Sequence, residues 1–114
     1  MSPSPSSTEN RRQRRRKSKR STKVICTRGL MRMGPNQART LLDLSATGAA
    51  LVVTASFHAG ENLVLELDIT WRARPLQAPA RVIWCVPTSN ARYCIGVKLE
   101  RPLDHRDLSD FASA

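Results

Sequence analysis

The stretch Leu63-Val-Leu-Glu-Leu-Asp-Ile-Thr70 carries the clearest structural signal in the chain. Leucine or isoleucine stands at every second position from Leu63 to Ile69, and most of the other positions are polar. Successive side chains of a β-strand point to opposite faces, so a period of two predicts a strand with one buried face. This stretch therefore predicts a sheet with a core on one side.

Other segments show the same short apolar character, with turn residues between them. Alternation recurs in residues 80–86 and 93–99, which are joined by a loop at 87–91. The remaining predicted strands cover residues 24–33, 37–44 and 49–55. Short turns favour antiparallel pairing, because a parallel crossover needs a dozen or more residues. Six antiparallel strands predict an all-β domain, either a barrel or a sandwich.

The last stretch of the chain has a helical pattern. Asp104 is suited to cap a helix, and Asp107 follows three residues later. Leu108 and Phe111 would then share one face of that helix. We expect a short C-terminal helix that closes one end of the barrel.

The positive charge is concentrated near the N-terminus. The chain has 114 residues and a formal net charge of +10. Residues 1–23 hold nine Lys or Arg residues and one Glu, a net charge of +8, which leaves +2 for the rest. Residues 1–10 are rich in Ser and Pro without apolar periodicity, which predicts a disordered tail. We expect a basic ligand-binding arm at 11–23, where an anionic partner would bind, and a barrel at 24–112.

Several classes of protein do not fit this composition. Cys26, Cys85 and Cys94 form no C-x-x-C pair, which argues against a disulfide framework and against a zinc site. His58 and His105 accompany no nucleophile or metal motif, so an enzyme is not expected. The chain lacks an apolar run of ~20 residues and the apolar region of a secretory signal. These features predict a cytoplasmic protein without a cofactor or metal.

The arginine run makes nucleic-acid binding one alternative, because clustered guanidinium groups neutralise phosphates. Single strands are usually also bound by stacking bases on aromatic side chains, and this chain has few of them. Trp84 and Tyr93 lie on apolar faces of predicted strands, so we interpret both as core residues. A solvated tail is the other simple interpretation of the run.

Two motifs point to a more specific ligand. The hexapeptide Asp43-Leu-Ser-Ala-Thr-Gly48 lies between two predicted strands, and alone it is typical of a turn bonded by its own side chains. Arg16 and Arg20 form an R-x-x-x-R pair just before the first predicted strand. R-x-x-x-R followed by [D/N]-x-S-x-x-G resembles the signature of the PilZ domain, a bacterial receptor for cyclic di-GMP. The resemblance covers roughly residues 11–112.

The resemblance implies a six-stranded antiparallel β-barrel that binds cyclic di-GMP through Arg16, Arg20, Asp43, Ser45 and Gly48. Each arginine can pair with a phosphate or with the O6/N7 edge of guanine. Asp43 can accept hydrogen bonds from guanine, and Ser45 can bond the ring edge or a phosphate. Gly48 is expected to permit a positive φ and to leave room for the ligand.

Other arginine pairs share the R-x-x-x-R spacing. They are Arg11/Arg15, Arg12/Arg16 and Arg28/Arg32. Nearness to the strand favours Arg16 and Arg20, with Arg12 and Arg15 as alternative ligand contacts. Arg28 and Arg32 are expected inside the first strand, which is a less mobile place from which to hold a ligand.

The resemblance also implies a signalling role. Ligand binding would order the basic arm over the barrel, and a downstream protein effector would respond to the change. The alternative within the same fold is a protein-interaction module that does not bind the nucleotide. The sequence leaves the oligomeric state open.

Overall fold

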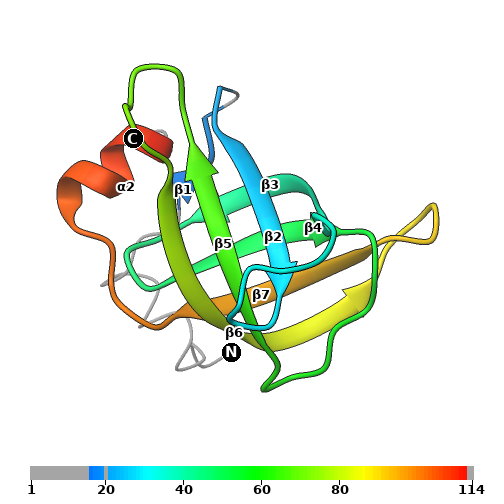
Figure 1. Cartoon of the computed structure of the whole chain (residues 1–114). Helices are drawn as coiled ribbons and strands as arrows, with labels where there is room; N and C mark the ends of the chain where they lie inside the picture. The colour runs from blue at the N-terminus through cyan, green and yellow to red at the C-terminus, as the bar shows by residue number, and fades with distance from the viewer. Residues whose placement is uncertain (1–15, 20, 113–114) are drawn as a thin grey trace, which may run out of the picture.

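The computed structural model describes residues 16–19 and 21–112, which form an antiparallel sheet curled into a half-barrel (Figure 1). The tail expected at 1–10 lies outside these residues. The described part of the chain contains seven strands and one short helix. The strands are β1 (Arg16–Lys17), β2 (Lys23–Arg28), β3 (Ala38–Leu44), β4 (Gly48–Val53), β5 (Asn62–Asp68), β6 (Leu76–Pro87) and β7 (Tyr93–Leu99).

The sheet curls far enough to join strands from its two sides. The strand order is β1-β3-β4-β7-β6-β5-β2, and every neighbouring pair is antiparallel. At the start of β3, the backbone N–H of Gln37 donates to the carbonyl of Cys26 in β2 over 2.7 Å. The side-chain oxygen of Asn36 accepts from the N–H groups of Cys26 and Ala38, each at 2.9 Å. These bonds fasten β2 to the beginning of β3, so one curled sheet encloses the core.

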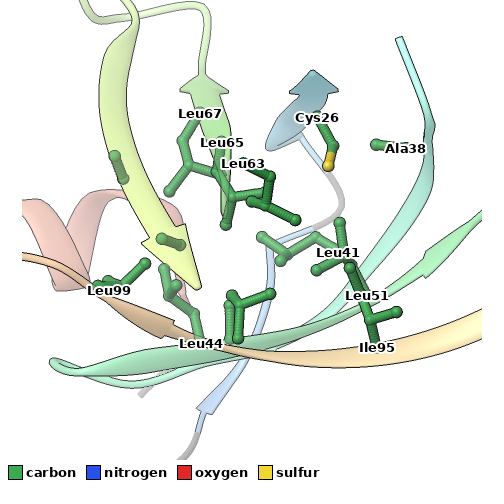
Figure 2. Close-up of a cluster of buried hydrophobic side chains, with 14 of the residues drawn as sticks. Cys26, Ala38, Leu41, Leu44, Leu51, Leu63, Leu65, Leu67, Ile95 and Leu99 are labelled. Atoms are coloured by element: carbon green, nitrogen blue, oxygen red, sulfur yellow. The ribbon is translucent and has the colours of Figure 1, made fainter. Parts of the chain in front are cut away.

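The strand predicted at 63–70 is confirmed as β5, and its leucine face lies in the core. Leu63, Leu65 and Leu67 are fully buried inside the curl (Figure 2). The other core residues labelled in Figure 2 are Cys26, Ala38, Leu41, Leu44, Leu51, Ile95 and Leu99. Burying a leucine or isoleucine side chain contributes about 1.5–3 kcal/mol, so this cluster is the main source of the domain's stability.

The expected C-terminal helix is present as α2 (His105–Phe111). Asp104 is its N-cap, and the carboxylate accepts a hydrogen bond from the N–H of Asp107 over 2.7 Å. Leu108 and Phe111 are both buried, as their spacing predicts. The helix lies at one end of the half-barrel, beside the loop that follows β5 (Figure 1).

Two predictions about the first strands are wrong. The prediction of six strands omits β1, a two-residue strand that pairs with β3. The strand expected at 24–33 ends at Arg28, because Gly29 follows with a φ of 79°. Arg32 has a φ of 55° and lies in the loop after β2, not inside a strand.

A β-bulge in β6 shifts the alternation of its second half. In the pairing of β6 with β7, Ile83 is the extra residue between Val82 and Trp84. Val82 is buried, whereas the side chain of Trp84 is 37% exposed. The prediction that Trp84 is a core residue is therefore wrong, since one extra residue moves the following side chains to the other face. Tyr93 is half-buried and packs against the core, as predicted.

Candidate functional site

The hexapeptide at 43–48 forms the tight connection between β3 and β4. Ser45 is buried, and its N–H donates to the carbonyl of Gly48 over 2.8 Å. Its hydroxyl accepts from the N–H groups of Gly48 at 3.0 Å and Thr47 at 3.4 Å. In this structure Ser45 therefore builds the turn, and its contact with a ligand stays a prediction.

Two further backbone bonds fix this turn to the last residue of β7 and to the segment that follows it. The N–H of Leu99 donates to the carbonyl of Thr47 over 2.8 Å, and the N–H of Leu103 donates to that of Ala46 over 2.7 Å. The turn is thus held by β3, by β4 and by the chain that leads to α2. A ligand would meet a fixed surface at this point.

Gly48 has a different structural role from the expected one. The glycines with positive φ among the described residues are Gly29, Gly34 and Gly60, so the prediction of a positive φ at Gly48 is wrong. A Cβ atom on Gly48 would instead lie 2.8 Å from the carbonyl oxygen of Val97 in β7. Glycine is required here because β4 and β7 approach each other closely.

The strand β1 places the end of the basic arm beside the hexapeptide. Arg16 pairs with Leu44, and Lys17 pairs with Asp43. The next arm residue, Ser18, donates its hydroxyl hydrogen to the carbonyl of Leu41 over 2.5 Å. The arm and the first residue of the D-x-S-x-x-G motif therefore lie on neighbouring strands.

The structure describes four of the five residues expected to bind the ligand. Arg20, and the alternatives Arg12 and Arg15, lie outside the described residues. Arg16 is half-buried, and its pairing places it on the same face of the sheet as Leu44, which points into the core. Arg16 is therefore next to Leu44 of the motif, but its side chain is on the core side of the sheet.

The arm continues from β1 to the C-terminal helix. The backbone N–H of Lys19 and the hydroxyl of Thr22 both donate to the carbonyl of Phe111, each over 2.9 Å. The ammonium group of Lys19 lies 5.2 Å from the centre of the Trp71 ring, within the range of a cation–π interaction. The end of α2 therefore holds the arm across one end of the half-barrel.

One row of paired residues crosses five neighbouring strands, from β1 to β6. It consists of Lys17, Asp43, Ala50, Gly96 and Trp84. Residues that pair on adjacent strands point to the same face. The next row along is buried in the core and consists of Leu44, Ala49, Val97 and Val82. Successive rows point to opposite faces, so the row that contains Asp43 and Trp84 lies on the outer face.

Trp84 is a candidate site residue that sequence reasoning missed. A Cβ atom on Gly96 would overlap the indole ring, so the ring lies directly over the backbone of β7. Only Ala50 separates Gly96 from Asp43 in the row. A partly exposed indole near a carboxylate can stack on a purine whose N–H groups donate to the carboxylate. One sequence signal could have indicated this position. Residues 82–86 are all apolar, whereas a strand with one buried face needs an apolar residue only at every second position, so some of these side chains had to lie on the outer face.

The thiol of Cys94, which lies near this row, has a pKa above its ordinary value. Burial raises the pKa of Cys94, and Asp43 and Cys85 raise it further. In the core, burial raises the pKa of Cys26 to about 12. All three cysteines are free thiols. A thiol needs its thiolate form to act as a nucleophile or metal ligand, so the raised pKa values of Cys26 and Cys94 do not favour either chemistry at these two residues.

Within residues 16–19 and 21–112, His, Cys, Asp and Glu side chains form no group that could hold a metal ion. In this same part of the chain, no helix is long and apolar enough to cross a membrane.

A comparison with known protein families identifies the family to which this chain belongs. The sequence profile of the PilZ domain matches residues 9–113, nearly the whole chain. The chain belongs to the PilZ domain family. No curated protein and no solved structure matches this PilZ domain. The family is known for cyclic di-GMP binding, so the resemblance seen in the two motifs is confirmed at the level of the family.

Proposed function

We propose that this PilZ domain is a cyclic di-GMP receptor whose binding surface is the outer face beside the β3–β4 turn. The observation that carries the proposal is the pairing of β1 with β3, which puts Lys17 of the arm directly opposite Asp43. Cyclic di-GMP has two phosphates and two guanines. Its site needs cations and a hydrogen-bond acceptor for guanine, and these groups meet here.

The residues have separate roles in this proposal. Asp43 accepts hydrogen bonds from guanine N–H groups, and Trp84 offers its exposed indole for stacking. Arg16 and Arg20 bind phosphate or the guanine O6/N7 edge through their planar guanidinium groups. Ser45 stabilises the turn, and in this way it contributes to binding by holding Asp43 in position.

The position of Arg16 supports a conformational response. Arg16 shares the face of Leu44, whereas the proposed ligand surface is the face of Asp43. The arm must shift or rotate before the Arg16 guanidinium reaches a ligand on the outer face. That movement would disturb the bonds from Lys19 and Thr22 to Phe111. A downstream protein effector would then respond to the altered surface around α2.

Titration calorimetry of the purified chain with cyclic di-GMP tests the binding. We expect saturable heat with cyclic di-GMP and much weaker binding of cyclic di-AMP. The adenine ligand keeps both phosphates but lacks the guanine O6 and the N1–H and N2–H₂ groups, which would donate hydrogen bonds to Asp43. A folded protein that produces no heat with cyclic di-GMP would contradict the proposal.

Amide hydrogen exchange tests the arm movement separately. We expect the ligand to change exchange at Lys19, whose N–H donates to Phe111 in the present structure. Exchange at Leu65, in the middle of β5, should stay the same. Binding without any change at Lys19 would leave the receptor function intact and contradict the switch of the arm.

A further inference from the structure

Two cations on the outer face stand directly opposite each other. Arg81 in β6 pairs with Lys98 in β7, and both side chains are exposed. Their neighbours Ala80, Val82 and Val97 are buried, so both cations point outward. Like charges directly opposite across an antiparallel pair are destabilising. An anion bound between the two charges would offset this repulsion.

Within residues 16–19 and 21–112, no acidic side chain forms an ion pair with Arg81 or Lys98. Among the described residues, neither Arg81 nor Lys98 forms an ion pair or a side-chain hydrogen bond. Glu100 lies two residues beyond Lys98 and forms no ion pair with either cation. Among the described residues, both cations therefore keep their hydrogen-bond donors unused and exposed.

The two cations line a surface hollow of about 450 Å³. Leu30 and Ile83 contribute apolar side chains to the hollow, and Asn62 contributes an amide. Asn62 pairs with Arg81, so the amide and both cations form one continuous row. Glu100 also lines the hollow, so the charged side chains there are two cations and one carboxylate, a net charge of +1. A hollow with a net positive charge, an amide and apolar groups suits a phosphate that is attached to an organic ligand.

This row begins at the D-x-S-x-x-G motif. Gly48 pairs directly with Lys98, so Gly48, Lys98 and Arg81 lie side by side on three adjacent strands. Lys98 is two residues from Gly96, over which the Trp84 ring lies. The Cα atoms of Asp43 and Lys98 are about 12 Å apart, taking ~4.8 Å per strand and ~3.4 Å per residue. The long side chains of Lys98 and Arg81 can reach toward Asp43, so a dinucleotide bound to Asp43 has to span a shorter distance to contact these cations.

We propose that Arg81 and Lys98 bind one phosphate of cyclic di-GMP. This inference rests on the proposed receptor function. Arg81 can bind two phosphate oxygens at once through its planar guanidinium, and Lys98 adds a point charge from the adjacent strand. The bound phosphate removes the repulsion between the two cations. The ligand then extends from the Asp43 turn past Trp84 to the hollow.

Glutamine substitutions at the two positions test the inference. Arg81→Gln and Lys98→Gln keep a long polar side chain and remove the charge. Each should weaken cyclic di-GMP binding by about tenfold, which is the effect of losing one charge-assisted contact. Arg74→Gln is the matched control, because Arg74 is exposed in the loop beyond the other end of β5. Its affinity should stay within about twofold of the wild type, as expected for a surface substitution away from the ligand.

Thermal unfolding without ligand, followed by circular dichroism, separates binding from structure. Each glutamine variant should unfold at the same temperature as the wild type or slightly higher, because the substitution relieves repulsion between like charges. Arg81→Lys keeps the charge but loses the planar fork, and its affinity should fall between those of the wild type and Arg81→Gln.

The outcomes distinguish the two proposals. Wild-type binding with unchanged affinity in Arg81→Gln and Lys98→Gln would overturn the phosphate site and leave the receptor function standing. Weaker binding together with a lower unfolding temperature would assign the pair a structural role and also overturn the site. A wild-type chain that does not bind cyclic di-GMP would overturn both proposals.

Discussion

The strands β5 and β1 belong to one sheet but are held in very different ways. β5 pairs along its length with both β2 and β6, and Leu63, Leu65 and Leu67 are completely buried. β1 pairs with β3 through two residues only, and neither is buried. Local opening requires little free energy where few contacts are broken. The arm therefore can move while the barrel stays folded, and substitutions in the two regions should have different signatures.

The largest effect is expected in the barrel. Leu65→Ala removes a fully buried side chain from the middle of β5 and should lower the free energy of unfolding by about 2–5 kcal/mol. Urea unfolding followed by circular dichroism measures the loss. Arg39→Ala, at an exposed position in β3, is the control and should stay within about 0.5 kcal/mol of the wild type. A loss below about 1 kcal/mol for Leu65→Ala would contradict the assignment of β5 to the centre of the core.

Ser45→Ala should affect both stability and binding. The substitution removes the hydroxyl acceptor of two part-buried hydrogen bonds, from the N–H groups of Gly48 and Thr47, each with a net contribution of about 0.5–1.5 kcal/mol. Urea unfolding and calorimetry are measured on the same preparation, with the exposed Ser56→Ala as control. Unchanged stability combined with lost binding would mean that Ser45 acts on the ligand directly and not by shaping the turn.

Arg20→Ala tests which arginines of the arm bind the ligand. With Arg16 and Arg20 as the binding pair, this substitution should weaken cyclic di-GMP binding by about tenfold, or about 1.4 kcal/mol. Arg11→Ala removes the same charge from the same arm and should change affinity little. Equal losses in the two variants would show that the arm contributes only its total charge.

Thr22→Val should have the smallest effect. It removes the hydroxyl that donates to Phe111, a bond whose net contribution is about 0.5–1.5 kcal/mol. Because the arm opens locally, we expect faster amide exchange at Lys19 and an unchanged urea midpoint. The exposed Thr70→Val is the control. A shifted midpoint would show that the arm and the barrel unfold together.

Much of the fold could be predicted from the sequence because its strongest patterns are local. The alternation at 93–99 gave the bounds of β7, and Asp104 correctly marked the start of α2. The break in the alternation at Ile83 could not be predicted from the sequence. A bulge depends on how β6 pairs with β7, and Val82–Val86 is apolar on both faces. Trp84 was consequently placed in the core.

The candidate site was predictable in part for a similar reason. The D-x-S-x-x-G motif is continuous in sequence, so its position between β3 and β4 followed from the flanking strands. The outer-face row joins Asp43 to Trp84 through two other strands, and only the register of the folded sheet brings them together. The close approach that requires a glycine at position 48 likewise involves Val97, which is distant in sequence but lies in the neighbouring strand of the sheet.

The positions of the two tryptophans have an optical consequence. Trp84 lies on the proposed ligand surface, whereas Trp71 lies under the ammonium group of Lys19 in the arm. A guanine stacked on Trp84 would quench its emission, and withdrawal of Lys19 would alter the emission of Trp71. The chain has only these two tryptophans, so Trp71→Phe and Trp84→Phe each leave a single fluorophore. Stopped-flow fluorescence of the Trp71→Phe variant would then time ligand arrival, and the same measurement on the Trp84→Phe variant would time arm release.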